Sequence, residues 1–191
     1  MEHNRIILQS SVLGQTRPAK QNSLYLKPLE EYWGPEPLHP LLEANPGFRQ
    51  ILSTIDASVP FVYEGLSFYT IMHAQMYKRY ALCPSEAIKF SLNSSTTLST
   101  DIPAVLLHTC RSDAQWHRLL TFLEKPVYLT AITAAKFEKN PTSLPAQLLI
   151  ATETAELWQQ MPSLNNRTIQ FYRLHYLEQI RSRLIAATLN K

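Results

Sequence analysis

The sequence predicts an α+β fold that is mainly helical, with one small β-hairpin and an extended, proline-rich N-terminal arm. Residues 1–50 hold six of the thirteen prolines and three of the four glycines. The rest of the chain instead shows apolar residues at helical spacing between capping residues. With 191 residues, 45% of them hydrophobic, the chain can build one sizeable core. We therefore expect an arm over residues 1–50 and a helical domain over residues 51–191.

The arm is expected to run as extended chain and turns. Each proline removes a backbone donor and restricts the residue before it, so Tyr32–Phe48 (YWGPEPLHPLLEANPGF) cannot be a long helix or a central strand. The arm is too apolar for a solvated linker, so it lies either on its own domain or on a neighbouring chain. We expect partial docking on its own domain, with Arg5–Leu13, which contains the strand-like run Ile6–Leu8, free to reach further.

The stretch Phe61–Tyr80 (FVYEGLSFYTIMHAQMYKRY) carries the strongest local signals. Aromatic and β-branched residues predict two short strands, Phe61–Tyr63 and Leu66–Tyr69, joined by a two-residue turn at Glu64-Gly65. Thr70 is a natural N-cap for a helix that should end near Cys83. Four polar side chains of this stretch are candidates for a functional site: Glu64, His73, Lys78 and Arg79.

The other elements follow from capping residues, prolines and helical spacing. Between the arm and Pro126, helices are expected over Pro46–Ile55, Ser85–Leu92, Pro103–Arg111 and Ala114–Glu124. After Pro126, they are expected over Val127–Lys139, Leu144–Ile150, Thr154–Met161 and Thr168–Leu189. A third strand could come from the arm.

Several classes of function are disfavoured by composition. The net charge of +3 is too small to indicate nucleic acid or an anionic membrane, and the basic C-terminal helix suits a solvated face. The chain has no glycine after Gly65, which excludes a glycine-rich phosphate loop and a dinucleotide fingerprint. The histidines lack close ligand spacing and Cys83 and Cys110 form no CxxC pair, so we expect no metal and no cofactor.

The expected location is an intracellular reducing compartment, either the cytoplasm or a virion assembled there. The two isolated cysteines suit reduced thiols better than a disulfide. The N-terminus MEHNRIILQSS lacks a hydrophobic signal core, and no apolar run is long enough to cross a membrane.

Three segments, in order, resemble the NADAR (YbiA-like) family. The first is Phe61–Tyr80, which is similar to the family's apolar strand, D/E/N-G turn, aromatic strand and T-x-E-H helix with a lysine six residues after the histidine. The second is Ala131–Leu157, similar to M-x-x-A-x-x-x-K-F-x-x-N-x-x-L-x-x-L-L-x-x-T-G-x-x-x-L. The third is Leu177–Leu184, similar to the closing L-M-x-x-R-x-x-L. The resemblance spans about residues 59–184 and leaves the arm outside.

The resemblance implies a mainly helical α+β fold and an N-glycosidase that hydrolyses the bond between ribose C1′ and nitrogen in riboflavin-pathway intermediates or ADP-ribosylated guanine. It also implies an acidic group and a helical lysine in one pocket. Here the acidic position is Met72, the lysine position is Arg79 with Lys78 beside it, and the glycine of T-G is Glu153. A methionine cannot transfer a proton, and an arginine cannot act as a neutral nucleophile.

We therefore expect a catalytically degenerate NADAR-like domain that serves as a structural or binding component of a larger assembly, for example a minor virion or capsid protein or a subunit of an organellar complex. Its partners would be other protein subunits. The alternatives are a working N-glycosidase on an ADP-ribose-like or riboflavin-pathway nucleotide, which would recruit His73, Lys78, Arg79 or Glu64, and a pseudoenzyme that only binds a nucleotide.

Overall fold

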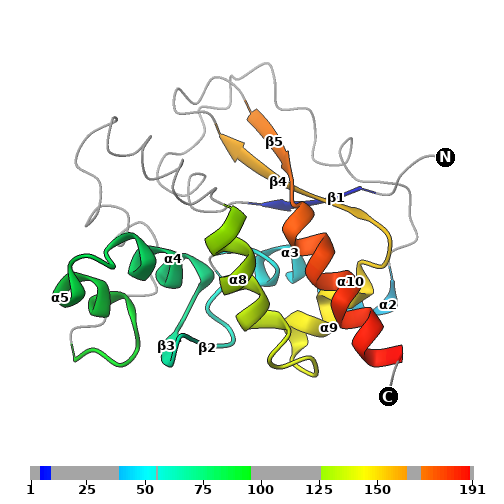
Figure 1. The fold of residues 1–191 in the computed structure, drawn as a ribbon. Coiled ribbons are helices and arrows are strands. Elements are labelled where there is room, and N and C mark those ends of the chain that lie inside the picture. Colours follow the sequence, from blue (N-terminus) through cyan, green and yellow to red (C-terminus); the bar gives the residue numbers. More distant parts are fainter. Residues whose placement is uncertain (1–4, 10–38, 55, 96–125, 163–168, 190–191) are drawn as a thin grey trace. The chain divides into compact units, whose positions relative to one another are not determined.

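The computed structural model describes residues 5–9, 39–54, 56–95, 126–162 and 169–189, and its elements are shown in Figure 1. The chain forms two compact units: unit 1 combines residues 1–53 with 141–191, and unit 2 is residues 54–140. Unit 2 is thus an insertion in the chain of unit 1, a division that differs from the predicted boundary between residues 50 and 51. Helices predominate over short strands in an α+β fold, as predicted.

Unit 1 contains a three-stranded sheet with the order β1-β4-β5. Strand β4 (Glu156–Pro162) lies in the middle, parallel to β1 (Arg5–Gln9) and antiparallel to β5 (Ile169–Arg173), as Figure 1 shows. In the β1–β4 register Ile6 is opposite Leu157, and both side chains are buried. Successive side chains of a strand alternate between the two faces of a sheet, so these strands place one apolar face against the core of unit 1.

Two predicted helices were wrong in this sheet. The segment predicted as helix Thr154–Met161 forms strand β4, and the first part of the predicted helix Thr168–Leu189 forms strand β5. Only the remainder is helical, as α10 (His175–Leu189). Both errors have one cause. Ladder hydrogen bonds to β1 and between β4 and β5 outweigh the local helix propensity of these short segments.

The N-terminal run Ile6–Leu8 is a strand, as predicted. The expectation that Arg5–Leu13 is free to reach further than its own domain was wrong for residues 5–9, the part of this segment that the structure describes. Residues 5–9 pair with β4 of the same chain, with Ile6 and Leu8 buried. Burial of these two side chains removes apolar surface from water, which fixes this end of the arm to unit 1.

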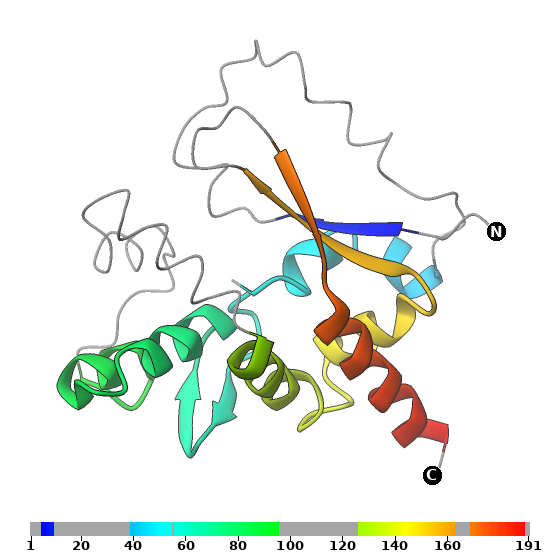
Figure 2. The ribbon, with the colours of Figure 1, turned by 45° about the horizontal axis from the view of Figure 1, so that its top comes forward.

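Four helices complete the described part of unit 1, and Figure 2 shows them beside the sheet. They are α2 (Pro40–Glu43), α3 (Phe48–Ile51), α9 (Leu144–Ala151) and α10. Helix α3 packs on β1 and α9, and α10 packs on α9 and β4. Helix α3 occupies only residues 48–51 of the predicted helix Pro46–Ile55, which is thus shorter than expected. Helix α2 was not predicted, although its proline stands in the first turn, where a helix tolerates one.

Helix α9 begins where predicted, with the Ser143 hydroxyl accepting a hydrogen bond from the Ala146 backbone N–H, and it ends in an unusual conformation. Glu153, the residue after the C-cap Thr152, has φ +47°. Glycine commonly occupies this left-handed position because a Cβ atom is disfavoured there.

Replacing Glu153 by glycine should therefore stabilise the protein by about 0.5–1 kcal/mol, because it removes the Cβ atom from a left-handed residue. Chemical denaturation of the full chain measures the change. The matched control is Glu153→Ala, which removes the carboxylate and keeps the Cβ atom. Equal stabilisation by both variants would contradict the backbone explanation.

Unit 2 is built on the predicted hairpin and helix. Strands β2 (Phe61–Tyr63) and β3 (Leu66–Phe68) pair antiparallel, and helix α4 (Ile71–Arg79) follows. At the turn between the strands, Glu64 has φ +49° and Gly65 has φ +79°, as a two-residue hairpin turn with two left-handed residues requires. The predicted end of α4 near Cys83 was one turn too late.

The remaining described elements of unit 2 pack around α4, and the last of them also packs on the hairpin. The predicted helix Ser85–Leu92 is a short α5 (Pro84–Ala87) followed by the 3-10 helix η2 (Ile88–Phe90), and the predicted helix Val127–Lys139 is α8 (Pro126–Phe137). Helix α8 packs on α4 and β2, and α4 also packs on β3 and η2. The Phe68 ring lies in this core, with ring centroids 6.2 Å from Phe61 and 5.5 Å from Tyr77.

The predicted helices Pro103–Arg111 and Ala114–Glu124 lie outside the described residues. Among the helices that the structure does describe, none combines the length and apolar character that a bilayer crossing needs.

Candidate functional site

The hairpin turn and the end of α4 bring two of the four predicted site residues together. The Lys78 Nζ atom lies 2.8 Å from Glu64 Oε1 and 3.1 Å from Glu64 Oε2. It also lies 5.9 Å from the centroid of the Tyr63 ring and 5.8 Å from that of Tyr128, at the start of α8. One ammonium group is thus bordered by a carboxylate and two aromatic rings that come from the hairpin and a second helix.

Each charge of this pair stabilises the other in its ionised form. The hydrogen bond from Lys78 lowers the pKa of Glu64, and the same bond raises the pKa of Lys78. Burial is the main reason why the pKa of Tyr63 is raised, and a hydrogen bond with Glu64 adds to it. The side chains of Lys78 and Glu64 are 21% and 44% exposed, so solvent screens the attraction and the ion pair contributes little to stability.

His73 has a structural position in the helix start. Its side chain is fully buried, and its Nδ1 atom lies 2.8 Å from the Thr70 hydroxyl oxygen. The same hydroxyl accepts a hydrogen bond from the His73 backbone N–H, which makes Thr70 the predicted N-cap of α4. The Tyr69 ring meets the imidazole edge-on at 6.3 Å. His73 precedes Lys78 by five residues, which places the two side chains about 140° apart around the helix.

Replacing Thr70 by valine should cost about 1–2 kcal/mol of stability, because it leaves the buried His73 backbone N–H without its acceptor at nearly constant volume. Thr70→Ser keeps the hydroxyl and is the matched control. Thermal and urea unfolding of the full chain measure both variants. A loss in Thr70→Val no larger than in Thr70→Ser would contradict the capping explanation, because only the valine variant lacks the hydroxyl.

Two further positions that the NADAR pattern concerns, Met72 and Arg79, lie on α4. Met72, at the position of the expected carboxylate, is 7% exposed, and its backbone N–H donates to the Thr54 carbonyl at 3.0 Å. Arg79 is half-buried. It follows Lys78 directly, so its side chain leaves α4 about 100° away from the Lys78 side chain.

Sequence reasoning missed a buried ion pair in unit 2. The Lys136 Nζ atom, on α8, lies 2.8 Å from Asp56 Oδ2 and donates to the Asp56 carbonyl at 2.9 Å. Both side chains are almost wholly buried. Burial lowers the pKa of Lys136, and the Asp56 carboxylate opposes that shift. Ser58 donates to the same carboxylate through its hydroxyl and its backbone N–H. The two partners are 80 residues apart, so no local pattern could have indicated the pair.

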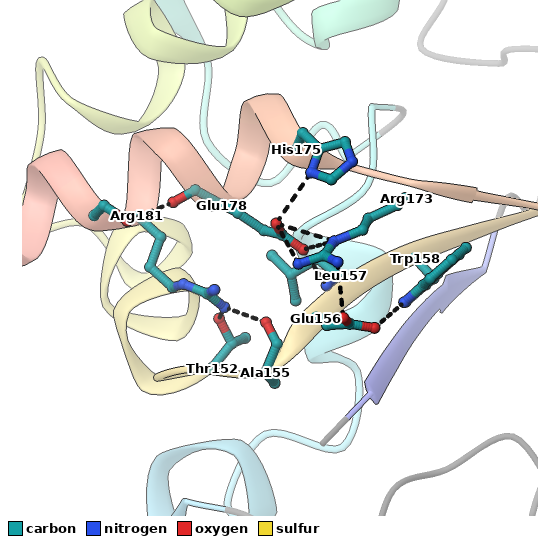
Figure 3. A network of polar contacts seen from close by, with 10 residues as sticks. Thr152, Ala155, Glu156, Leu157, Trp158, Arg173, His175, Glu178 and Arg181 are labelled. Atoms are coloured by element: carbon teal, nitrogen blue, oxygen red, sulfur yellow. Dashed lines mark hydrogen bonds and ion pairs between the residues drawn. The ribbon is translucent and has the colours of Figure 1, made fainter. Parts of the chain in front are cut away.

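Unit 1 has its own polar network, shown in Figure 3. The Arg173 guanidinium donates to Glu156 at 2.7 Å and to Glu178 at 3.1 Å, where β4, β5 and α10 meet. Glu178 also accepts a hydrogen bond from the Leu157 backbone N–H, and His175 Nδ1 lies 3.5 Å from its second oxygen. The arginine thus bridges two carboxylates and fixes the start of α10 to the sheet.

A second arginine in Figure 3 connects α10 to the end of α9. Arg181 is buried, and its Nη1 atom donates to the Thr152 hydroxyl and to the Ala155 carbonyl, both at 2.8 Å. Burial lowers the pKa of this guanidinium. Arg181 therefore satisfies a backbone carbonyl beside the left-handed residue Glu153.

The chemistry open to these clusters is limited by their mutual contacts. Glu64 and Lys78 neutralise each other at the surface of unit 2, and the buried Lys136 is paired with Asp56. Within the described ranges, no group of three or more His, Cys, Asp or Glu side chains could hold a metal ion. Of the candidates, the partly exposed cluster of Tyr63, Glu64, Lys78 and Tyr128, called the Lys78 cluster below, is the one placed to meet a ligand or partner.

Comparison of the chain with protein-family models, with curated proteins and with solved structures found no match.

Proposed function

We propose that this chain is a catalytically degenerate, NADAR-like domain that acts as a binding or structural component of a larger protein assembly. The observation that carries the proposal is the Glu64–Lys78 ion pair, at 2.8 Å, in the stretch where the NADAR pattern expects catalytic groups. A glycosidase needs a carboxyl group that gives or takes a proton at the scissile bond. A carboxylate whose pKa is lowered by a lysine stays ionised and is a poor proton donor.

The surroundings of the other candidates support the same proposal. His73 is buried and hydrogen-bonded at the helix start, and Met72 offers no ionisable group at the position of the expected carboxylate. Catalysis through His73 would require the histidine to leave Thr70 and become exposed. Such a rearrangement would uncap α4.

Two details favour a NADAR-like arrangement of the chain. Glu153, at the position of the family's T-G glycine, has the positive φ that glycine adopts readily. Arg181, at the arginine of the closing L-M-x-x-R motif, bonds to Thr152 and Ala155 in the second resembling segment. Two resembling segments thus contact each other within unit 1.

An activity assay on the purified full chain tests the proposal. Incubation with ADP-ribosylated guanosine, and separately with a riboflavin-pathway intermediate that carries a ribose–nitrogen bond, should release no base above a protein-free blank in chromatography. Release of base by the wild type, together with its loss in Lys78→Ala, would overturn the proposal in favour of an N-glycosidase. Equal release by both proteins would indicate either a contaminant or a site elsewhere on the chain. A repeat purification and the destabilised variant K136M distinguish the two, because only release by the chain itself should fall when the chain is destabilised.

The assembly part of the proposal has a separate test. Cross-linking followed by mass spectrometry on the chain in its native particle should recover links between its lysines and other protein subunits. If the chain yields only internal links and is a monomer by light scattering at native concentration, the structural role is wrong.

A further inference from the structure

We propose that Tyr63, Glu64 and Tyr128 form a receptor for the ammonium group of a lysine on a partner protein, and that Lys78 fills this receptor in the free chain. The inference deepens the proposed function, on which it rests, by naming the chemistry of the partner at the Lys78 cluster. The observation is that one ammonium, Lys78 Nζ, has two aromatic rings within 6 Å and a carboxylate at 2.8 Å.

Every group of this receptor favours a cation. The faces of two tyrosine rings attract a lysine ammonium through their quadrupoles when it lies within about 6 Å of the ring centroids, as Lys78 Nζ does here. The Glu64 carboxylate adds a full negative charge and two acceptor oxygens. The cluster also lies at the C-terminal turn of α4 (Ile71–Arg79), where the helix dipole is negative. An anionic ligand such as a phosphate would be repelled by the same groups once Lys78 left.

Lys78 can be exchanged at small cost. Its side chain is 21% exposed and that of Glu64 is 44% exposed, so water reaches the ion pair. Surface ion pairs of this kind contribute little to stability, and lysine has a long side chain that can rotate into solvent. The receptor groups, by contrast, are held by the fold. Tyr63 and Glu64 belong to the hairpin, whose turn is fixed by two left-handed residues, and Tyr128 belongs to α8, which packs on β2.

The simplest occupant is the same chemical group that the receptor holds now. A partner lysine would replace one ammonium by another, keep the Glu64 charge neutralised and release Lys78 to solvent. The exchange leaves the number of charges in this partly exposed cluster unchanged, so no additional ion has to be desolvated. Docking of a partner would then be competitive with Lys78, so removal of Lys78 should strengthen it.

The test uses n-butylammonium chloride, which reproduces the end of a lysine side chain, with sodium chloride at equal concentration as the ionic-strength control. Titration of the full chain is followed by amide chemical shifts in ¹H–¹⁵N spectra. Lys78→Ala should bind the probe about fivefold more tightly than the wild type, because it empties the receptor. Adding Tyr63→Leu or Glu64→Gln to Lys78→Ala should return the affinity to the wild-type level.

The matched control is Lys89→Ala. Lys89 is also a partly exposed lysine of unit 2 that pairs with a glutamate, Glu86, at 2.6 Å, and its removal should leave the affinity for the probe unchanged. If Lys78→Ala loses the dispersed spectrum of a folded protein, Lys78→Gln serves for the same comparison.

Two results would overturn the receptor. One is an affinity of Lys78→Ala that does not exceed those of the wild type and of Lys89→Ala. The other is a gain that persists in the double variant with Tyr63→Leu, because the carboxylate alone would then account for it. Base release by the wild type in the hydrolysis assay would sink the proposed function without changing these affinities, so the two failures are distinguishable.

Discussion

Replacing Lys136 by methionine is expected to lower the free energy of unfolding by about 3–5 kcal/mol, the largest single effect foreseen here. The substitution keeps the apolar stem and removes the ammonium, which leaves the Asp56 carboxylate buried without its cation. Burial of an unpaired charge is costly, so the carboxyl must take up a proton or unit 2 must open. Urea denaturation and hydrogen exchange of the full chain measure the loss, which exchange should place in residues 54–140.

Two further variants separate the charge from the packing. Lys139→Met changes an exposed lysine near the end of the same unit and should cost less than about 0.5 kcal/mol. Lys136→Met combined with Asp56→Asn should recover part of the stability, because asparagine is neutral, its carbonyl oxygen can still accept from the Ser58 backbone N–H, and its amide NH2 can donate to the Ser58 hydroxyl. A loss in Lys136→Met no larger than in Lys139→Met would show that the pair does not stabilise unit 2.

Replacing Arg181 by methionine is expected to cost about 2–3 kcal/mol, in unit 1. The guanidinium donates to the Thr152 hydroxyl and the Ala155 carbonyl, and hydrogen bonds to a charged group are stronger than those between neutral groups. Methionine fills the apolar part of the space but leaves the Ala155 carbonyl without this donor. Denaturation of the full chain gives the free energy, and hydrogen exchange should rise first around the end of α9.

The control for this variant stands on the same helix. Arg183→Met alters an exposed arginine of α10 and should change the stability by less than about 0.5 kcal/mol. Arg181→Lys should fall between the two, because lysine keeps the charge but lacks the planar guanidinium that donates in a fixed geometry. A loss in Arg183→Met equal to that in Arg181→Met would mean that the charge of α10, not the bonds of Arg181, is responsible.

The elements that could be predicted have their cause close by in the chain. Thr70 and Ser143 cap α4 and α9 because their hydroxyls accept hydrogen bonds from backbone N–H groups three residues later. The turn at Glu64-Gly65 needs two left-handed residues, and glycine, which adopts this conformation readily, supplies one of them. Within such segments, type and starting residue follow from local chemistry.

The wrong predictions concern segments whose structure depends on distant partners. Residues 156–162 have local helix propensity, yet they pair on one side with Arg5–Gln9 and on the other with Ile169–Arg173. A short segment gains little from helix formation, because the nucleus is costly and few bonds follow it. The ladder to two neighbouring strands therefore decides its conformation.

The candidate site divides in the same way. Glu64 and Lys78 could be named from the sequence because they belong to a polar group beside a turn and a helix. Their contact at 2.8 Å depends on how the hairpin folds onto α4, and the two tyrosines that complete the Lys78 cluster come from β2 and α8. In the sequence His73 was a site candidate on the same terms as Lys78. The helix places its side chain on a different face from that of Lys78, and the His73 side chain is buried.

The sequence by itself determined the mainly helical α+β class, the hairpin with its left-handed turn, the caps of α4 and α9, and the absence of a carboxylate at Met72. Only the tertiary structure decided that β1, β4 and β5 form a sheet, that Asp56 meets Lys136, and that Lys78 lies between two tyrosine rings. The physical reason is range. Capping and turn conformations act over a few residues, whereas strand ladders, buried ion pairs and ring–cation contacts join residues that only the folded chain brings together.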